Sequence, residues 1–206
     1  MMGFEGQDSG RELRRIVRIN EEIKTVVKTA YRINLMAMNA IFLAKRAGQS
    51  ALGFGVLSNE LRRFATDLEK QMLDLGQATG GSVATVTAMV KEARIVNVME
   101  RARAQSDGAG REIIDEFLRR RRTTTLSDRQ DQVAALNRNL SMMIESTSRL
   151  VEMGGVLARS AKIEAAYGGG FSQSLKQVSS DFEDTIGEIR KSLDSLGKFQ
   201  RREFAA

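Results

Sequence analysis

The side chains that usually carry chemistry are scarce in this 206-residue chain, which has no histidine and no cysteine. An imidazole general base, a thiolate nucleophile and the usual ligands of zinc or haem iron are therefore absent from the sequence. Aspartate, glutamate and lysine remain, but no spacing pairs them as an acid and a base. The sequence predicts a protein that is not an enzyme and that needs no metal and no cofactor.

Glycine clusters are the next candidates for a chemical site. Gly80-Gly81 and Gly168-Gly169-Gly170 do not follow a predicted strand, and neither cluster carries the Lys-Ser/Thr pair of a nucleotide-binding loop. We interpret Gly168-Gly169-Gly170 as a turn, and Gly80-Gly81 as either a helix break or a stutter in the heptad pattern.

A run of four arginines, Arg119, Arg120, Arg121 and Arg122, stands out in a chain of net charge +6. Clustered guanidinium groups release counterions from phosphates, so one hypothesis is a basic helical scaffold that binds nucleic acid or an anionic membrane through residues 111–122. Against this hypothesis, no aromatic residues interleave with the arginines, and arginines at a helix end also complement its dipole. Nucleic acid or membrane is therefore the weaker interpretation.

Long helices must position these residues, because the chain has no proline and only 5% aromatic residues. Such a composition is typical of thin helix-on-helix layers. Apolar residues alternate at spacings of three and four from about Ser9 to Ala47, which predicts one helix with a heptad seam. The seam consists of Ile16, Ile19, Ile23, Val26, Ala30, Ile33, Ala37, Ala40 and Ala44. Because alanine replaces isoleucine and valine toward its end, we expect the helices to approach closely there.

Two hairpins organise the chain. The first pattern halts at residues 47–50 and resumes at Gly53, and a second pair of helical patterns is separated by the turn at residues 167–170. The predicted fold class is all-α, an elongated antiparallel four-helix bundle made of two tandem hairpins. The predicted parts are a disordered N-terminus at 1–9, a first hairpin at 10–79, a connector at 80–126 and a second hairpin at 127–206. Within the connector we expect a loop at 105–110 and a short helix at about 111–122, with a new helix starting near Asp128.

The sequence around the first turn resembles that of a known protein family. The residues concerned are Asn34, Ala37, Asn39, Ala40, Ala44, Arg46, Ala47, Gly48, Gly53, Phe54, Val56, Glu60, Arg62 and Ala65. In this order and spacing, without a gap, they resemble the signalling tip of bacterial chemoreceptors, the methyl-accepting chemotaxis proteins. The resemblance implies the U-turn of a long antiparallel coiled coil, which docks a histidine kinase and a coupling adaptor.

A second, more divergent copy of this tip is indicated at residues 157–166, which resemble the same family pattern. In our alignment the alanines pair as Ala37 with Ala158, Ala40 with Ala161 and Ala44 with Ala165. Gly53-Phe54 then pairs with Gly170-Phe171, after a turn about four residues shorter. Since the receptors are homodimers of such hairpins, the resemblance implies that this chain forms a pseudo-dimer by itself.

The resemblance also implies the docking residues. In the family a glutamate and an arginine flank the tip, but the first hairpin has Leu43 in place of the glutamate and the second has Tyr167 in place of the arginine. The predicted partner-binding residues are Asn39, Leu43, Arg46, Phe54, Val56, Leu57 and Glu164. The alternative is that only the fold survives, with the apolar tip packed inside the pseudo-dimer and Arg46 serving as a helix-end charge.

Location and assembly follow from the apolar pattern. No apolar run reaches about 18 residues and no signal-peptide core follows Met1, so we expect a cytoplasmic protein. Apolar residues outside the seam, among them Met38 and Phe42, make the end of the first helix apolar around much of its circumference. We therefore expect that copies of the chain can associate through the apolar tip to form a homo-oligomer.

Overall fold

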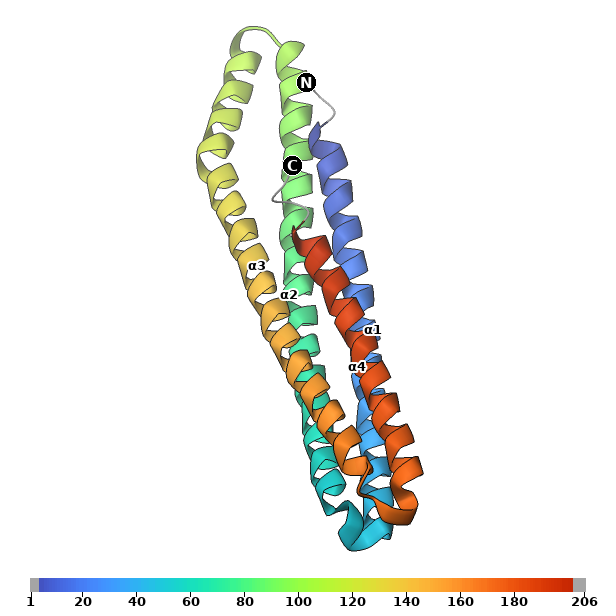
Figure 1. The fold of residues 1–206 in the computed structure, drawn as a ribbon. Coiled ribbons are helices and arrows are strands. Elements are labelled where there is room, and N and C mark those ends of the chain that lie inside the picture. The colour runs from blue at the N-terminus through green and yellow to red at the C-terminus, as the bar shows by residue number, and fades with distance from the viewer. Residues whose placement is uncertain (1–3, 202–206) are drawn as a thin grey trace. The chain divides into compact units, whose positions relative to one another are not determined.

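The computed structural model describes the backbone of residues 4–201, and the side chains of residues 14–121 and 131–199 except Val86, Met89 and Val133. Within this range every regular element is helical, which confirms the all-α prediction (Figure 1). The elements are α1 (Phe4–Ala47), η1 (Gly48–Ala51), α2 (Leu52–Ala104), α3 (Gly108–Ala165), η2 (Gly169–Phe171) and α4 (Ser172–Arg201).

The chain divides into two compact units. Unit 1 combines the part of α1 up to Arg18 with Gln77–Leu140, and unit 2 combines Ile19–Gly76 with the chain from Ser141 onward. Within unit 1, Arg15 of α1 donates a hydrogen bond of 3.2 Å to Oδ1 of Asn137 in α3. Unit 2 contains parts of all four helices and both of the short η elements, so it holds the two predicted hairpin turns.

The predicted seam of α1 is confirmed, because all nine of its residues are buried. Near the turn the seam is alanine, and a Cβ added to Gly55 of α2 would lie 3.4 Å from Cβ of Ala44. The two helices therefore approach closely there, as the small residues predicted. Three glycines provide the left-handed backbone at the chain reversals, with φ of 68° at Gly48, 54° at Gly108 and 55° at Gly169.

Two helix starts differ from the prediction, and the alternative left open at Gly80-Gly81 is resolved in favour of an unbroken helix. α1 begins at Phe4, so residues 4–9 are helical, whereas residues 1–3 of the predicted disordered segment lie outside the described residues. α2 runs without a break through Gly80-Gly81, and α3 continues from Gly108 through the predicted new start near Asp128. Glycine costs a helix only about 1 kcal/mol relative to alanine, and threonine and serine cost less, so neither segment is a strong breaker.

The continuity of α2 leads to a stability prediction. A Cβ added to Gly80 or Gly81 would meet nothing within 4 Å, and neither glycine has a positive φ. Each Gly→Ala substitution is therefore expected to raise the free energy of unfolding by about 0.5–1 kcal/mol, measured by urea unfolding. Gly48→Ala is the control, because its positive φ should make alanine destabilising there. A loss of stability at Gly80 and Gly81 would mean that the helix breaks.

The buried positions of the two hairpins of unit 2 repeat at a constant interval of 121 residues. The interval separates Ala44 from Ala165, Ser58 from Ser179 and Leu75 from Leu196, all of them buried, and it also separates the turn glycines Gly48 and Gly169. Ser58 and Ser179 even make the same bond, from the side-chain hydroxyl to the carbonyl four residues earlier, at 2.8 and 2.9 Å. We call residues separated by this interval register counterparts.

This register corrects the predicted alignment of the second arms. The turn of the second hairpin is not four residues shorter, and Gly53-Phe54 has the counterpart Ser174-Leu175 instead of Gly170-Phe171. Phe54 and Leu175 are both fully buried, whereas Phe171 ends η2 and is half-buried. The shared Gly-Phe dipeptide was therefore a chance match of sequence.

Candidate partner-docking surface

The two turns of unit 2 lie at the same end of that unit, here called the turn end and made of residues 46–53 and 164–172 (Figure 1). A Cβ added to Gly169 would lie 3.7 Å from Oγ of Ser50, so the turns are neighbours. The carboxyl group of Glu164 packs against Gly53, where it occupies the space that a Cβ would need. The turn end therefore brings Glu164 of the second hairpin onto the first hairpin, which also carries Arg46.

The predicted docking residues fall into three classes of exposure. Asn39, Arg46 and Val56 are exposed, whereas Leu43, Leu57 and Glu164 are half-buried. Phe54 is 0% exposed, which contradicts its predicted role as a surface contact. The physical reason is periodicity, since Phe54 lies on the same face of α2 as the buried Ser58 and Leu61, at spacings of four and seven residues.

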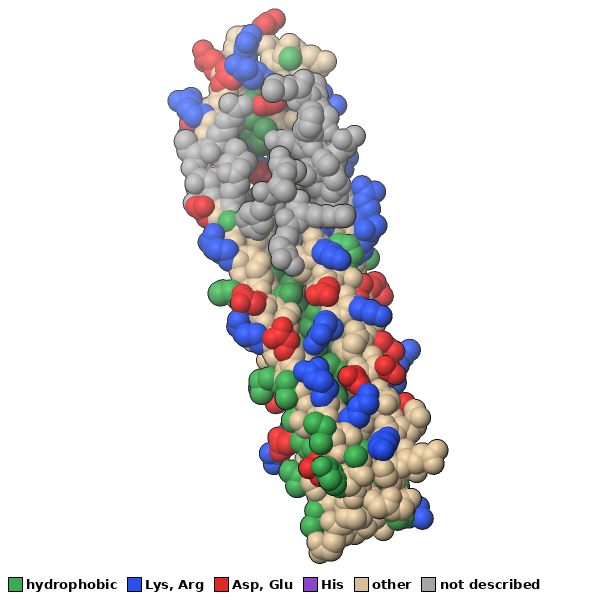
Figure 2. Space-filling model, in the orientation of Figure 1, with side chains coloured by type: hydrophobic (Ala, Val, Ile, Leu, Met, Phe, Trp, Pro, Cys, Tyr) green, Lys and Arg blue, Asp and Glu red, His purple; other side chains and the backbone are tan. Residues whose placement is uncertain are grey.

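A second apolar stripe runs along the outer side of α1. Its members are Tyr31, Leu35, Met38 and Phe42, all exposed and spaced by four, three and four residues. In α3 the register counterparts of Leu35 and Phe42 are Val156 and Ile163, which are also exposed. Figure 2 shows hydrophobic side chains reaching the surface between charged ones on the lower part of its view.

Tyr31, Val156 and Ile163 are not among the site residues predicted from the sequence. The signal that could have found them is a second three-and-four spacing, out of phase with the buried seam. Exposed large apolar side chains that gather on one region of a soluble protein indicate an interaction surface. The charges around the first hairpin have one sign, because residues 23–59 contain five lysines and arginines and no aspartate or glutamate.

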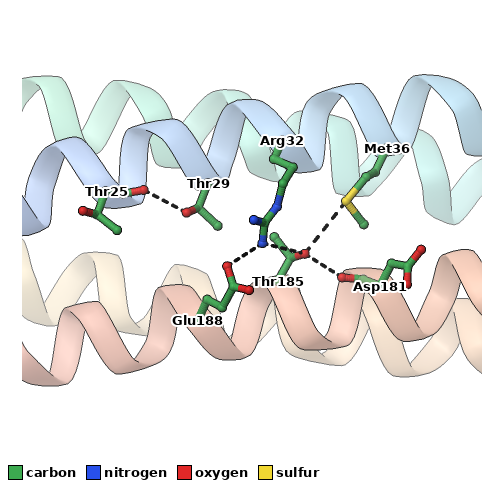
Figure 3. A network of polar contacts seen from close by, with 7 residues as sticks. All are labelled: Thr25, Thr29, Arg32, Met36, Asp181, Thr185 and Glu188. Carbon is green, nitrogen blue, oxygen red and sulfur yellow. Dashed lines mark hydrogen bonds and ion pairs between the residues drawn. The ribbon is translucent and has the colours of Figure 1, made fainter.

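A polar network ties α1 to α4 inside unit 2 (Figure 3). Arg32 forms an ion pair with Glu188 and donates a hydrogen bond of 3.3 Å to Oγ1 of Thr185. The Thr185 hydroxyl donates to the carbonyl of Asp181 at 2.6 Å, and its oxygen lies 3.9 Å from Sδ of Met36. Thr185 is buried and the Arg32–Glu188 pair is exposed, so this network links the two helices from the core of unit 2 to its surface.

A second interhelical pair makes stability depend on pH. Nζ of Lys162 in α3 donates to Glu183 of α4 at 2.8 Å, and this bond with the lysine charge lowers the pKa of Glu183. A lowered pKa adds stability above the ordinary carboxyl value, and that stability is lost as pH falls through the lowered value. Glu183→Gln should therefore weaken the loss of stability on acidification, measured by urea unfolding at neutral and acidic pH.

The expected effect of Glu183→Gln is small, because the two side chains are 51% and 41% exposed to solvent. Asp184→Asn, an exposed neighbour on the same helix, is the control. An identical change in the acid dependence of both variants would contradict a specific contribution of the Lys162–Glu183 pair.

The predicted basic run lies in unit 1 and is engaged with acidic residues. Arg119 and Arg120 both pair with Glu116, and their bond and charge lower the pKa of that carboxyl. Arg121 pairs with Glu92 of α2 at 2.6 Å and lies 4.7 Å from the ring centroid of Phe117. The side chain of Arg122 lies outside the described residues. These arginines act within unit 1, which gives no support to a phosphate-binding patch.

Metal-binding clusters and membrane-spanning helices are both absent from the described residues. These residues contain no group of three or more histidines, cysteines, aspartates or glutamates arranged to hold a metal ion. Likewise, none of the helices described is both long and apolar enough to cross a membrane.

Three curated proteins are similar to this chain. A putative methyl-accepting chemotaxis protein of Synechocystis is 24% identical over 200 residues, which is 93% of this chain and 18% of the relative. The methyl-accepting chemotaxis protein PscA of Pseudomonas syringae is 25% identical over 134 residues, 65% of this chain and 20% of PscA. The methyl-accepting chemotaxis protein HlyB of Vibrio cholerae is 29% identical over 89 residues, 43% of this chain and 15% of HlyB.

The chain thus covers a fifth or less of the length of these relatives. No protein-family profile matches the chain, and no solved structure matches it. The three similarities support the relation to methyl-accepting chemotaxis proteins that the wording of residues 34–65 indicated.

Proposed function

We propose that this chain is a non-enzymatic, chemoreceptor-like signalling protein whose turn end docks a chemotaxis histidine kinase and its coupling adaptor. The observation that carries the proposal is the turn end itself, where exposed apolar side chains accompany Arg46 and Glu164. Its similarity to three methyl-accepting chemotaxis proteins supports the same role. Burial of the apolar side chains would supply most of the affinity, and the charged pair would act at the rim.

The internal register suggests how one chain can provide such a surface. We propose that the two hairpins arose by duplication and that unit 2 is an antiparallel four-helix bundle, a single-chain counterpart of a receptor dimer. The constant interval of 121 residues and the paired turn glycines support this interpretation. The family's glutamate and arginine are then divided between the hairpins, as Glu164 in one and Arg46 in the other.

A pull-down against the kinase and coupling adaptor of the source organism, at low and high salt, tests the proposal. Wild-type protein should bind at both salt concentrations, because buried apolar contacts are not screened by ions, whereas binding to phosphates falls steeply with salt. The double variant Arg46→Ala/Val56→Asp should lose binding. Leu73→Asp is the matched control, because Leu73 is also exposed on α2, at 54%, but lies far along the helix from the turn.

The outcomes separate the interpretations. Binding that survives high salt, disappears in the double variant and persists in Leu73→Asp would support a docking turn end. Absence of binding by wild-type protein at both salt concentrations would overturn the proposal and leave a conserved fold without the family's partners.

A further inference from the structure

The outer faces of the two hairpins differ at equivalent positions, although their cores follow one register. In α2, Leu52 and Val56 lie one helical turn apart and are 60% and 62% exposed. Their register counterparts in α4 are Gln173 and Gln177, which are also exposed. Beside the turns, α2 therefore presents an apolar surface where α4 presents amides. The exposed apolar side chains of the second hairpin near its turn, Ile163 and Tyr167, lie on the α3 side.

The charges of the two faces also differ, because the face of α2 carries two acidic residues, Glu60 and Asp67, beside its two arginines, and Arg63 is paired with Glu60. Beyond Val56, α2 carries Arg62 and Arg63, whose counterparts in α4 are Glu183 and Asp184. A shallow hollow of about 680 Å³ lies along this face of α2. It is lined by Val56, Asn59, Glu60, Arg62, Arg63, Thr66 and Asp67. In α4 the same positions contain four acidic residues and no basic one.

The acidic face of α4 already has internal partners. Glu183 is paired with Lys162 of α3, and Glu188 is paired with Arg32 of α1. Part of the negative charge on α4 therefore holds unit 2 together. No large apolar side chain among the described residues of α4 is exposed, so this face lacks the apolar centre of a docking site.

We propose that each chain docks one molecule of the coupling adaptor, on the first hairpin alone, and that the contacting surface of this adaptor is apolar at its centre and acidic at its rim. The inference rests on the proposed function and adds to it the number of partner molecules bound per chain and the hairpin that binds them. Leu52 and Val56 provide the apolar contact, and Lys45, Arg46 and Arg62 attract the acidic rim. The same rim would be repelled by the acidic residues of α4.

The experiment titrates the full-length chain with the purified coupling adaptor and measures affinity and stoichiometry by calorimetry. Leu52→Gln/Val56→Gln gives the first hairpin the side chains of the second, and it should weaken binding by about tenfold or more. Gln173→Ala/Gln177→Ala is the matched control on α4 and should keep wild-type affinity. Both pairs are exposed, so circular dichroism should show an unchanged fold.

Wild-type protein should bind one adaptor per chain. Two adaptors per chain, or equal losses of affinity in the two double variants, would overturn the one-sided surface while leaving the proposed function intact. No binding by wild-type protein would overturn the proposed function and this inference with it.

Sedimentation of the chain alone and flotation with anionic vesicles complete the test. If the Gln substitutions at Leu52 and Val56 changed self-association or vesicle binding and left adaptor affinity intact, the occupant would be a second copy or a membrane, and the proposal would fail.

Discussion

Replacing Gly154 by alanine is expected to lower the free energy of unfolding by about 1–3 kcal/mol, the usual cost of forcing an extra methyl group into a packed core. A Cβ at this position of α3 would lie 2.6 Å from Cζ and 2.7 Å from Cε2 of Phe64 in α2. The Phe64 side chain is only 4% exposed, so its ring has no free space to turn into. Urea unfolding followed by circular dichroism measures the loss.

The adjacent glycine provides the control. A Cβ on Gly155 would meet only the ends of the Arg159 and Arg190 side chains, each at 3.6 Å. Gly155→Ala should therefore be neutral or should stabilise the helix by up to about 1 kcal/mol. Shortening the ring by Phe64→Leu should restore part of the stability of Gly154→Ala, which would appear as non-additivity in a double-mutant cycle. Equal effects at Gly154 and Gly155 would contradict the packing seen in unit 2.

The same contact shows how two hairpins with different residues can follow one burial register. Gly154 is the register counterpart of Ile33, and Phe64 is the counterpart of Thr185. The large ring of Phe64 in the first hairpin thus lies against a glycine of the second, whereas the counterpart positions hold the smaller Thr185 in the second hairpin and the larger Ile33 in the first. One set of positions therefore holds a large and a small residue and the other holds two of intermediate size, so the total volume differs little, as close-packed interiors require.

The periodicity of the sequence correctly predicted the features that depend on a single helix, such as which of its faces is buried. The seam from Ile16 to Ala44 is buried as expected, because a three-and-four spacing defines a helix face whatever packs against it. The break left open at Gly80-Gly81 is absent, because an unbroken helix tolerates two exposed glycines. By contrast, no pattern within α3 reveals that Phe64 of α2 lies across from Gly154. That contact depends on how two helices pack.

The candidate site was predicted less completely, for a related reason. The motif in residues 34–65 predicted the turn end and the exposed residues Arg46 and Val56. A motif gives residue types and spacing, however, and does not show which face of a helix each residue occupies. From the sequence, the dipeptide Gly53-Phe54 was aligned with Gly170-Phe171 of the second turn, and Phe54 was predicted to contact a docked partner. The structure overturns both, because the burial register assigns Phe54 to the core with Leu175.

Phe54→Ala is expected to show the second large effect, a loss of about 3–5 kcal/mol in the free energy of unfolding, as for other aromatic truncations in a core. The side chain is fully buried, and so is its counterpart Leu175. Phe54→Leu, which copies the second hairpin, should cost less because it leaves a smaller cavity. Val56→Ala should change stability by no more than about 0.5 kcal/mol, since this side chain is 62% exposed.

Measuring adaptor affinity on the same three variants separates a core residue from a docking residue. If Phe54 acts only through the core, Phe54→Leu should keep adaptor affinity at temperatures where it remains folded, whereas Val56→Ala should lower affinity with almost no change in unfolding. The reverse pattern, lost affinity without lost stability in Phe54→Leu, would mean that unit 2 opens on binding and exposes the ring. Docking would then be coupled to a rearrangement of the core, and the exposed face of α2 would account for only part of the contact.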